Sequence, residues 1–223
     1  MSPGFDGTSL RETLRTCSAA GLQVFGADSH CFELNPPLAS KAVDEFELRH
    51  GIGLPVDYRR FLLEVGDGGA GPSYGVFPLG FMDDNWGMKT WSEGDGFVGV
   101  LREPFPHDAP WNDLSGLPAD ELAKTNPDEY ERHLEKFDQR YWNPALMNGA
   151  FPLCHMGCAL RVWLVVSGGE AGFLWRDGRA ELSGLSPIVL KDGTRATFLS
   201  WYLEWLDGCF VSVGNRRPRR VET

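Results

Sequence analysis

A helix that is apolar on nearly every side sets the first limit on how this chain can fold. The pattern predicts a helix over 198–207 that Thr197 caps, with only Ser200, Glu204 and Asp207 in a polar stripe. A helix with so narrow a polar stripe must be largely buried against another layer of structure. The strand-like segments that precede it predict that this layer is a β-sheet.

The sheet is predicted mainly in the final third of the chain. Residues 160–166 form a nearly continuous apolar run, which is typical of a central strand covered on both faces. Gly168-Gly169 turns the chain, so that 171–176 can pair back as a hairpin. Shorter strands are predicted over 74–79, 97–101, 151–154 and 188–190.

Amphipathic spacing predicts further helices before the sheet. The first opens with Ser9 and Glu12 at the spacing of a capping box, and the last opens with the cap pair Asn126 and Glu129. The second begins at Asn35-Pro36. These helices are predicted over 9–21, 35–51, 55–66 and 127–141.

Length and composition indicate a protein of one domain in a reducing compartment. A chain of 223 residues suits one large domain, or one domain with a long insertion. Its five cysteines are scattered and odd in number, which favours reduced thiols. The first residues lack the pattern of a secretory signal, and no apolar run approaches the ~20 residues of a transmembrane helix. We therefore expect a cytoplasmic protein that does not enter a membrane.

Acidic residues gather in the middle of the chain. The net charge is −10, and residues 83–140 carry fourteen acidic against six basic side chains. This acidity disfavours nucleic-acid binding and permits a basic protein partner. The proline-containing breaks in this stretch are typical of a surface insertion. Two interpretations stay open: a solvated surface that aids solubility, or an acidic face that steers a cationic partner.

Several catalytic patterns occur without the structural context that they need. Gly71–Gly75 matches the nucleophile elbow around Ser73, but here a helix precedes the turn and a strand follows it. The glycine-rich stretches 66–71 and 94–99 spell the dinucleotide fingerprint, yet neither leads from a strand into a helix. We therefore expect no catalytic residue, no cofactor and no phosphate site.

Cys154, His155 and Cys158 offer two sulfurs and an imidazole within five residues. Tetrahedral zinc needs a fourth ligand, and the other cysteines are isolated, so we expect no metal. An enzyme that uses Cys154 and His155 stays open as one alternative to a binding protein.

Residues 46–62, which include Gly51, Leu54-Pro55 and Phe61, resemble the opening signature of the SUKH superfamily, the Smi/Knr-type domain. Gly68-Gly69 and Tyr74-Gly75 are similar to the glycine turn and strand that follow in that family. The motifs around 151–158, 160–166, 172–177 and 198–206 continue the resemblance in the same order. It spans about residues 35–208, with an expanded middle.

The resemblance implies an α+β fold with an N-terminal helix pair, a mixed or antiparallel β-sheet and a C-terminal helix packed on the sheet. It implies one SUKH-like domain over 35–211 with an acidic insertion at 82–148. Residues 1–34 would then be a helical extension, and the arginine-rich residues 212–223 a disordered tail. The family implies no catalytic residues: bacterial members are mostly immunity proteins that inactivate toxins, often nucleases, and fungal relatives are regulatory scaffolds.

An immunity protein that neutralises a basic toxin is the leading hypothesis, and a regulatory scaffold of the fungal type is the alternative. A nuclease needs a cationic groove for phosphate, which an acidic inhibitor could occupy. Exposed aromatic residues are typical interface anchors, although the tryptophans of the insertion can instead pack beneath a long loop. The predicted protein-binding residues are Asp67, Tyr74, Asp83, Asp84, Trp86, Trp91, Glu93 and Asp95.

Overall fold

A computed structural model describes residues 6–84, 87–94 and 97–211 of the chain. The predicted tail at 212–223 therefore lies outside the described residues. In chain order the elements are α1 (Gly7–Ala19), α2 (Ala27–His30), α3 (Ser40–His50), α4 (Val56–Glu64), β1 (Phe81–Asp84), β2 (Gly87–Thr90), α5 (Asp120–Thr125), α6 (Pro127–Tyr141), η1 (Pro144–Met147), β3 (Ala150–Gly157), β4 (Leu160–Val165), β5 (Leu174–Asp177), η2 (Arg179–Glu181), β6 (Leu185–Pro187) and α7 (Phe198–Val211).

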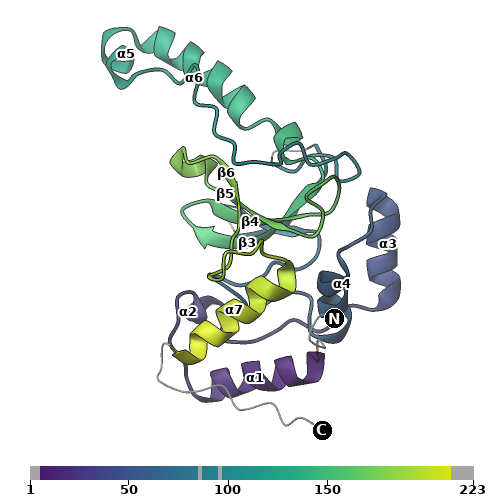
Figure 1. Cartoon of the computed structure of the whole chain (residues 1–223). Coiled ribbons are helices and arrows are strands. Elements are labelled where there is room, and N and C mark those ends of the chain that lie inside the picture. The colour runs from purple at the N-terminus through teal and green to yellow at the C-terminus, as the bar shows by residue number, and fades with distance from the viewer. Residues whose placement is uncertain (1–5, 85–86, 95–96, 212–223) are drawn as a thin grey trace.

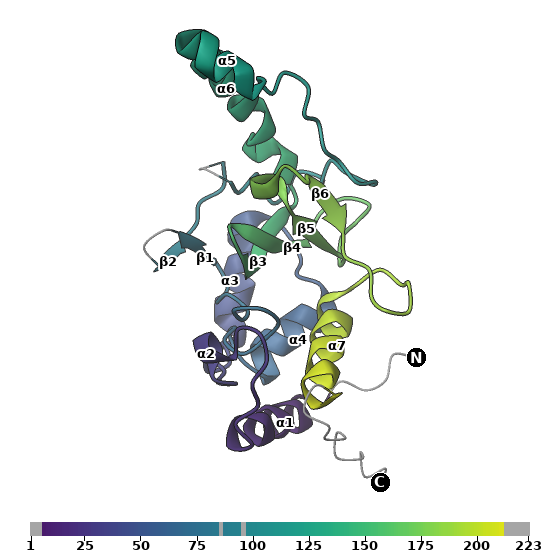
Figure 2. The same ribbon diagram turned by 90° about the vertical axis from the view of Figure 1, so that its left-hand side faces the viewer.

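The elements form a central sheet with helices at its two ends. Helices α1, α2, α4 and α7 gather at one end, and α5 and α6 project from the opposite end (Figures 1 and 2). The main sheet has the order β3-β4-β5-β6 and is antiparallel throughout, while β1 and β2 pair as a separate antiparallel hairpin. The predicted α+β fold is confirmed.

Strand β4 occupies the central position that its apolar run predicts. It pairs with β3 on one side and β5 on the other, and Trp163 stands opposite Trp175 in the β5 register. Both tryptophans are completely buried. Because both neighbours of β4 are strands and both of its faces are covered, its continuous hydrophobic sequence is satisfied.

Helix α7 is buried, as its narrow polar stripe predicts, and the element it chiefly contacts is α4, whereas the sequence predicts the sheet. Phe198 and Tyr202 are fully buried, and Phe198 packs edge-on against Phe61 at 4.8 Å between ring centroids. Tyr58 of α4 lies between Phe198, at 4.9 Å, and Phe151 of β3, at 5.8 Å. Tyr58 therefore joins the helices to the sheet in one core.

Two helices begin at positions other than those predicted. Helix α1 is capped by Asp6, whose carboxylate accepts a hydrogen bond from the Thr8 N–H at 3.0 Å, and not by the predicted capping box. Helix α3 begins only at Ser40. The Asn35 side chain instead donates to the carbonyl of Asp67 at 2.8 Å, which holds the preceding segment against the glycine turn.

Three predicted strands are wrong as regular strands. The segment 74–79 contributes only an isolated bridge at Val76, and 188–190 contributes only one at Val189. Residues 97–101 form turns and loop. In 74–79 and 97–101 buried side chains account for the apolar pattern, because burial alone does not require a strand's hydrogen-bond ladder, whereas Val189 in the third segment is 52% exposed.

Candidate protein-binding surface

Asp83 in β1 forms an ion pair with Arg161 in β4. Its carboxylate oxygens accept hydrogen bonds from Arg161 Nε at 2.8 Å and Nη2 at 3.1 Å, and His155 Nε2 lies 3.7 Å from Oδ2. The guanidinium also lies over the ring of Phe97. Arg161 is buried, so Asp83 supplies the counter-charge that a buried cation requires. This predicted binding residue is therefore engaged within the chain, where it fastens β1 to the main sheet.

Trp91 and Glu93, in the loop after β2, contact residues of α3. Trp91 is 9% exposed, and its ring packs at 6.0 Å from Phe46 and 6.1 Å from Phe151. Glu93 Oε1 lies 2.6 Å from His50 Nδ1. The exposed-anchor interpretation of Trp91 is thus not what the structure shows: this tryptophan packs beneath a long loop, which was the other interpretation.

Asp67 stabilises the turn after α4. Its Oδ1 accepts a hydrogen bond from the Leu79 N–H at 2.7 Å. Burial raises the pKa of Asp67, because the charged carboxylate loses hydration, while the hydrogen bond from Leu79 opposes this shift. Asp67 therefore holds two segments of the loop together.

Tyr74 is the predicted binding residue whose side chain is most clearly open to solvent. Tyr74 is 41% exposed, and its ring stacks on His155 at 5.3 Å and meets Phe25 edge-on at 5.2 Å between centroids. Phe25 is itself 66% exposed. We call Phe25, Tyr74 and His155 the aromatic ridge.

The backbone around the aromatic ridge is held in place by close packing. Gly26 has φ of 80°, and a Cβ at this position would lie 1.6 Å from the carbonyl oxygen of Ser73. Ser73 itself adopts φ of 54°, which is unfavourable for a residue other than glycine. The two loops that carry Phe25 and Tyr74 are therefore fixed against each other.

For the three remaining predicted binding residues, the structure describes only the place of Asp84. Asp84 ends β1, and Trp86 and Asp95 lie outside the described residues. The structure thus brings Asp83 close to His155 of the aromatic ridge, but it places Trp91 and Glu93 against α3 instead.

Comparison with protein families decides what kind of domain this is. The model of the SMI1/KNR4 family (SUKH-1) matches residues 37–182, more than half of the chain. The chain belongs to the SUKH-1 family. Comparisons with curated proteins and with solved structures give no match. SUKH-1 domains are generally non-catalytic, and they typically serve as immunity proteins in toxin systems.

The surroundings of Cys154 in this SUKH-1 chain are unfavourable for an enzyme that uses Cys154 and His155. Cys154 is completely buried in β3, and its Sγ lies 3.2 Å from the carbonyl oxygen of Pro72. Burial strongly raises the pKa of Cys154, which keeps the thiol protonated and a weak nucleophile.

Among the described residues, no group of three or more histidine, cysteine, aspartate or glutamate side chains is arranged to hold a metal ion. The described helices are also too short or too polar to span a bilayer.

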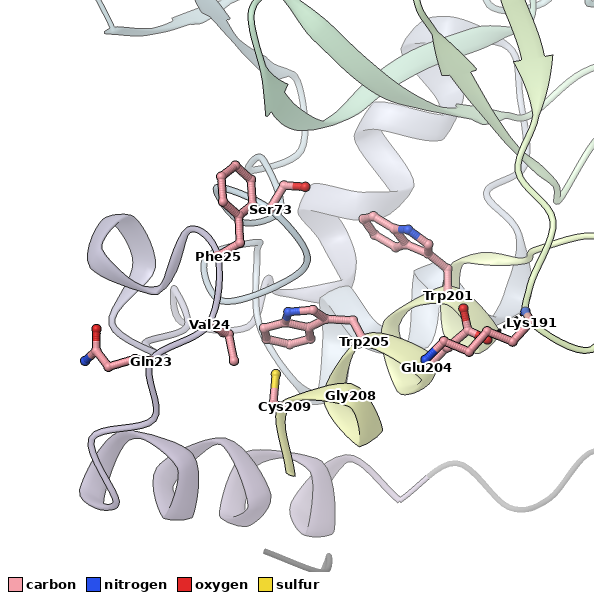
Figure 3. A pocket seen from close by; sticks show the side chains of 10 residues that line it. All are labelled: Gln23, Val24, Phe25, Ser73, Lys191, Trp201, Glu204, Trp205, Gly208 and Cys209. Carbon is pink, nitrogen blue, oxygen red and sulfur yellow. Dashed lines mark hydrogen bonds between the residues drawn. The ribbon is translucent and has the colours of Figure 1, made fainter. Parts of the chain in front are cut away.

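An open pocket of about 510 Å³ lies beside the aromatic ridge (Figure 3). It is formed by α7, by the loop before α2, by the loop between α4 and β1, and by the loop between β6 and α7. Its lining residues are Gln23, Val24, Phe25, Ser73, Lys191, Trp201, Glu204, Trp205, Gly208 and Cys209. All of them except Ser73 lie outside the segment that matches the SUKH-1 family.

Sequence reasoning missed this pocket. Trp201 and Trp205 have the spacing of a buried helical face, and they are interpreted as packing residues on that basis. The one local signal is that Glu204, a member of the polar stripe, lies between them. Phe25 comes from a distant segment without a clear period, so its approach to α7 leaves no mark in the local pattern.

Proposed function

We propose that this SUKH-1 protein binds a cognate protein toxin and neutralises it through an acidic interface. The family match over 37–182 is the observation that carries this proposal, because SUKH-1 domains typically act as immunity proteins. The net charge of −10 favours a basic partner, and a nuclease toxin has a cationic groove for its substrate.

Helix α6 offers an acidic face for such a partner. Asp128, Glu131, Glu135 and Asp138 are all exposed and follow one another at intervals of three and four residues, so they share one side of the helix. The helix projects away from the body of the molecule (Figures 1 and 2). Like charges at this spacing destabilise a helix by about 0.2–0.5 kcal/mol per pair, and a cationic partner would relieve that repulsion. We call these four residues the α6 acidic stripe.

Tyr74 is the proposed aromatic anchor of a second contact region, because it packs on Phe25 beside α2, at the end of the molecule opposite α6 (Figure 1). It is exposed and is held by His155 and Phe25, so little side-chain freedom is lost when a partner covers it. Asp84, Trp86 and Asp95 complete the proposed contact set from the sequence. Asp83 lies beside His155, which stacks on Tyr74, whereas Asp67 and Glu93 make internal contacts elsewhere.

The test is a tagged pull-down from the native cell at low salt, followed by stepwise salt elution and mass spectrometry. We expect one stoichiometric basic partner that salt releases, and loss of its toxic activity in the complex. A variant with lysine at all four positions of the α6 acidic stripe should lose the partner. The matched control reverses four exposed acidic residues elsewhere: Glu12, Asp28, Glu33 and Glu45.

The outcomes separate the hypotheses. A partner that remains fully toxic when bound would exclude the immunity function. Equal loss of binding in the control variant would show that overall charge matters and that the α6 acidic stripe does not. Many weak partners in place of one would favour the regulatory-scaffold alternative.

A further inference from the structure

The pocket beside α7 has the features of a site that receives a side chain from outside. Two tryptophans of α7, Trp201 and Trp205, form one wall, and Phe25 and Val24 form the other (Figure 3). We propose that this pocket binds an arginine or lysine side chain of the partner protein. The proposal rests on the proposed function only for the identity of that partner.

Gly208 provides the first argument. It lies inside α7, where a glycine destabilises a helix by roughly 0.5–1 kcal/mol relative to alanine. A helical glycine is commonly explained by close packing, yet a Cβ at this position would have nothing within 4 Å. Gly208 also lines the pocket. Its missing side chain therefore leaves the pocket open, whereas no packing constraint requires it.

The chemistry of the walls favours a cation. Aromatic faces attract ammonium and guanidinium groups through their π-electrons, and tryptophan does so best. Glu204 lies on the same face of α7 as Trp201 and Trp205, and its Oε2 accepts a hydrogen bond from the Lys191 N–H at 2.9 Å. This bond orients the carboxylate at the pocket. The apolar stem of an arginine or lysine side chain can pack on the tryptophan rings, and its positive head can approach the Glu204 carboxylate.

The position of the pocket along α7 adds to this preference. Gly208 and Cys209 belong to the last turn, where the helix dipole is negative and attracts cations. No basic side chain lies in the last turn of α7 as described through Val211. Lys191 also lines the pocket, and its ammonium group would compete with an incoming cation.

Tryptophan indole signals allow a direct test on the full-length chain. The probes are the blocked peptides acetyl-Leu-Arg-Leu-amide and acetyl-Leu-citrulline-Leu-amide, which differ in charge but hardly in shape. NMR titration should shift the indole N–H signals of Trp201 and Trp205. The arginine peptide should bind about two- to fivefold more tightly, as expected for a cation–π contact in a pocket that is open to solvent.

Variants at three positions separate a cation site from a merely apolar one. Glu204→Gln keeps the acceptor for the Lys191 N–H and should weaken the arginine peptide up to about fivefold. Lys191→Ala should strengthen it, because a competing ammonium is removed. Gly208→Leu should abolish binding without lowering the melting temperature, and Gly208→Ala is its control with binding retained.

Several results would overturn the proposal. Equal affinity for both peptides, or unchanged affinity in Gly208→Leu, would show that the pocket does not select a cation. A gain in affinity when Arg216, Arg217, Arg219 and Arg220 are all changed to alanine would show that the chain's own arginines occupy the pocket, which overturns its assignment to a side chain of the partner.

The inference and the proposed function can fail separately. If a toxin is captured and neutralised equally well by Gly208→Leu, the pocket is not part of the interface. If the arginine peptide binds as expected but no captured partner is neutralised, the immunity function fails and the cation preference of the pocket stands.

Discussion

Asp67 combines a structural hydrogen bond with an unfavourable buried charge. Because burial raises its pKa above the value in the unfolded chain, the folded state takes up a proton more readily. The wild type should therefore gain stability, relative to Asp67→Asn, as the pH falls from 7 through the raised pKa towards 4. Urea unfolding across this range measures the difference. A difference that does not vary with pH would show that the carboxylate is equally hydrated in both states.

Trp91 illustrates how burial separates packing residues from binding residues. Since it packs against Phe46 and Phe151 in the core, Trp91→Ala should lower the free energy of unfolding by about 3–5 kcal/mol. Chemical denaturation measures this change. Tyr74→Ala is the matched aromatic control and should affect stability much less, because its ring is exposed. An unchanged stability of Trp91→Ala would contradict this packing role and would make Trp91 a candidate binding residue again.

At the scale of elements, one ion pair attaches the β1–β2 hairpin to the main sheet. Asp83→Asn leaves the buried Arg161 without its counter-charge and should lower stability by about 2–3 kcal/mol. Adding Arg161→Met should recover much of this loss, because no buried cation then needs a partner. Glu45→Gln, which removes an exposed pair with Lys41, should change stability very little. Additive losses in the double variant would argue against a direct pair.

The β1–β2 hairpin and the short helix α5 were not predicted, and the reasons lie in their surroundings. All four residues of β2 are exposed, so its sequence shows no alternation between a buried and a solvent face. Helix α5 has only six residues and packs against α6. Helix α6, in contrast, was predicted with its cap: Asn126 accepts a hydrogen bond from the Glu129 N–H at 3.3 Å. Long periodic elements with local caps are the ones that a sequence indicates best.

At the scale of the whole molecule, the hydrophobic core extends beyond the family match. Leu10, Leu14 and Cys17 of α1 are buried in the same core as α4 and α7, although the match begins at residue 37. Deleting residues 1–21 removes this burial and should lower the free energy of unfolding by on the order of 5 kcal/mol. This loss is comparable with the stability of a whole domain. Circular dichroism should show loss of the cooperative melt.

Substituting the exposed residues Glu12 and Arg15 with alanine is the control for changes in α1, and it should leave the melt intact. A shortened chain that melts at the temperature of the full chain would show that the family segment folds without α1.

The sequence by itself determined the helices with clear periods, the central strand β4, the burial of α7 and the family. These features depend on spacings and caps within a few neighbouring residues. Such local patterns are present in the sequence whatever the tertiary contacts are. Only the tertiary structure decided that Asp83 pairs with Arg161, that Trp91 is buried, and that Val24 and Phe25 line one pocket with Trp205. Each of these depends on segments far apart in the chain, and their approach is set by how the layers pack rather than by any local pattern.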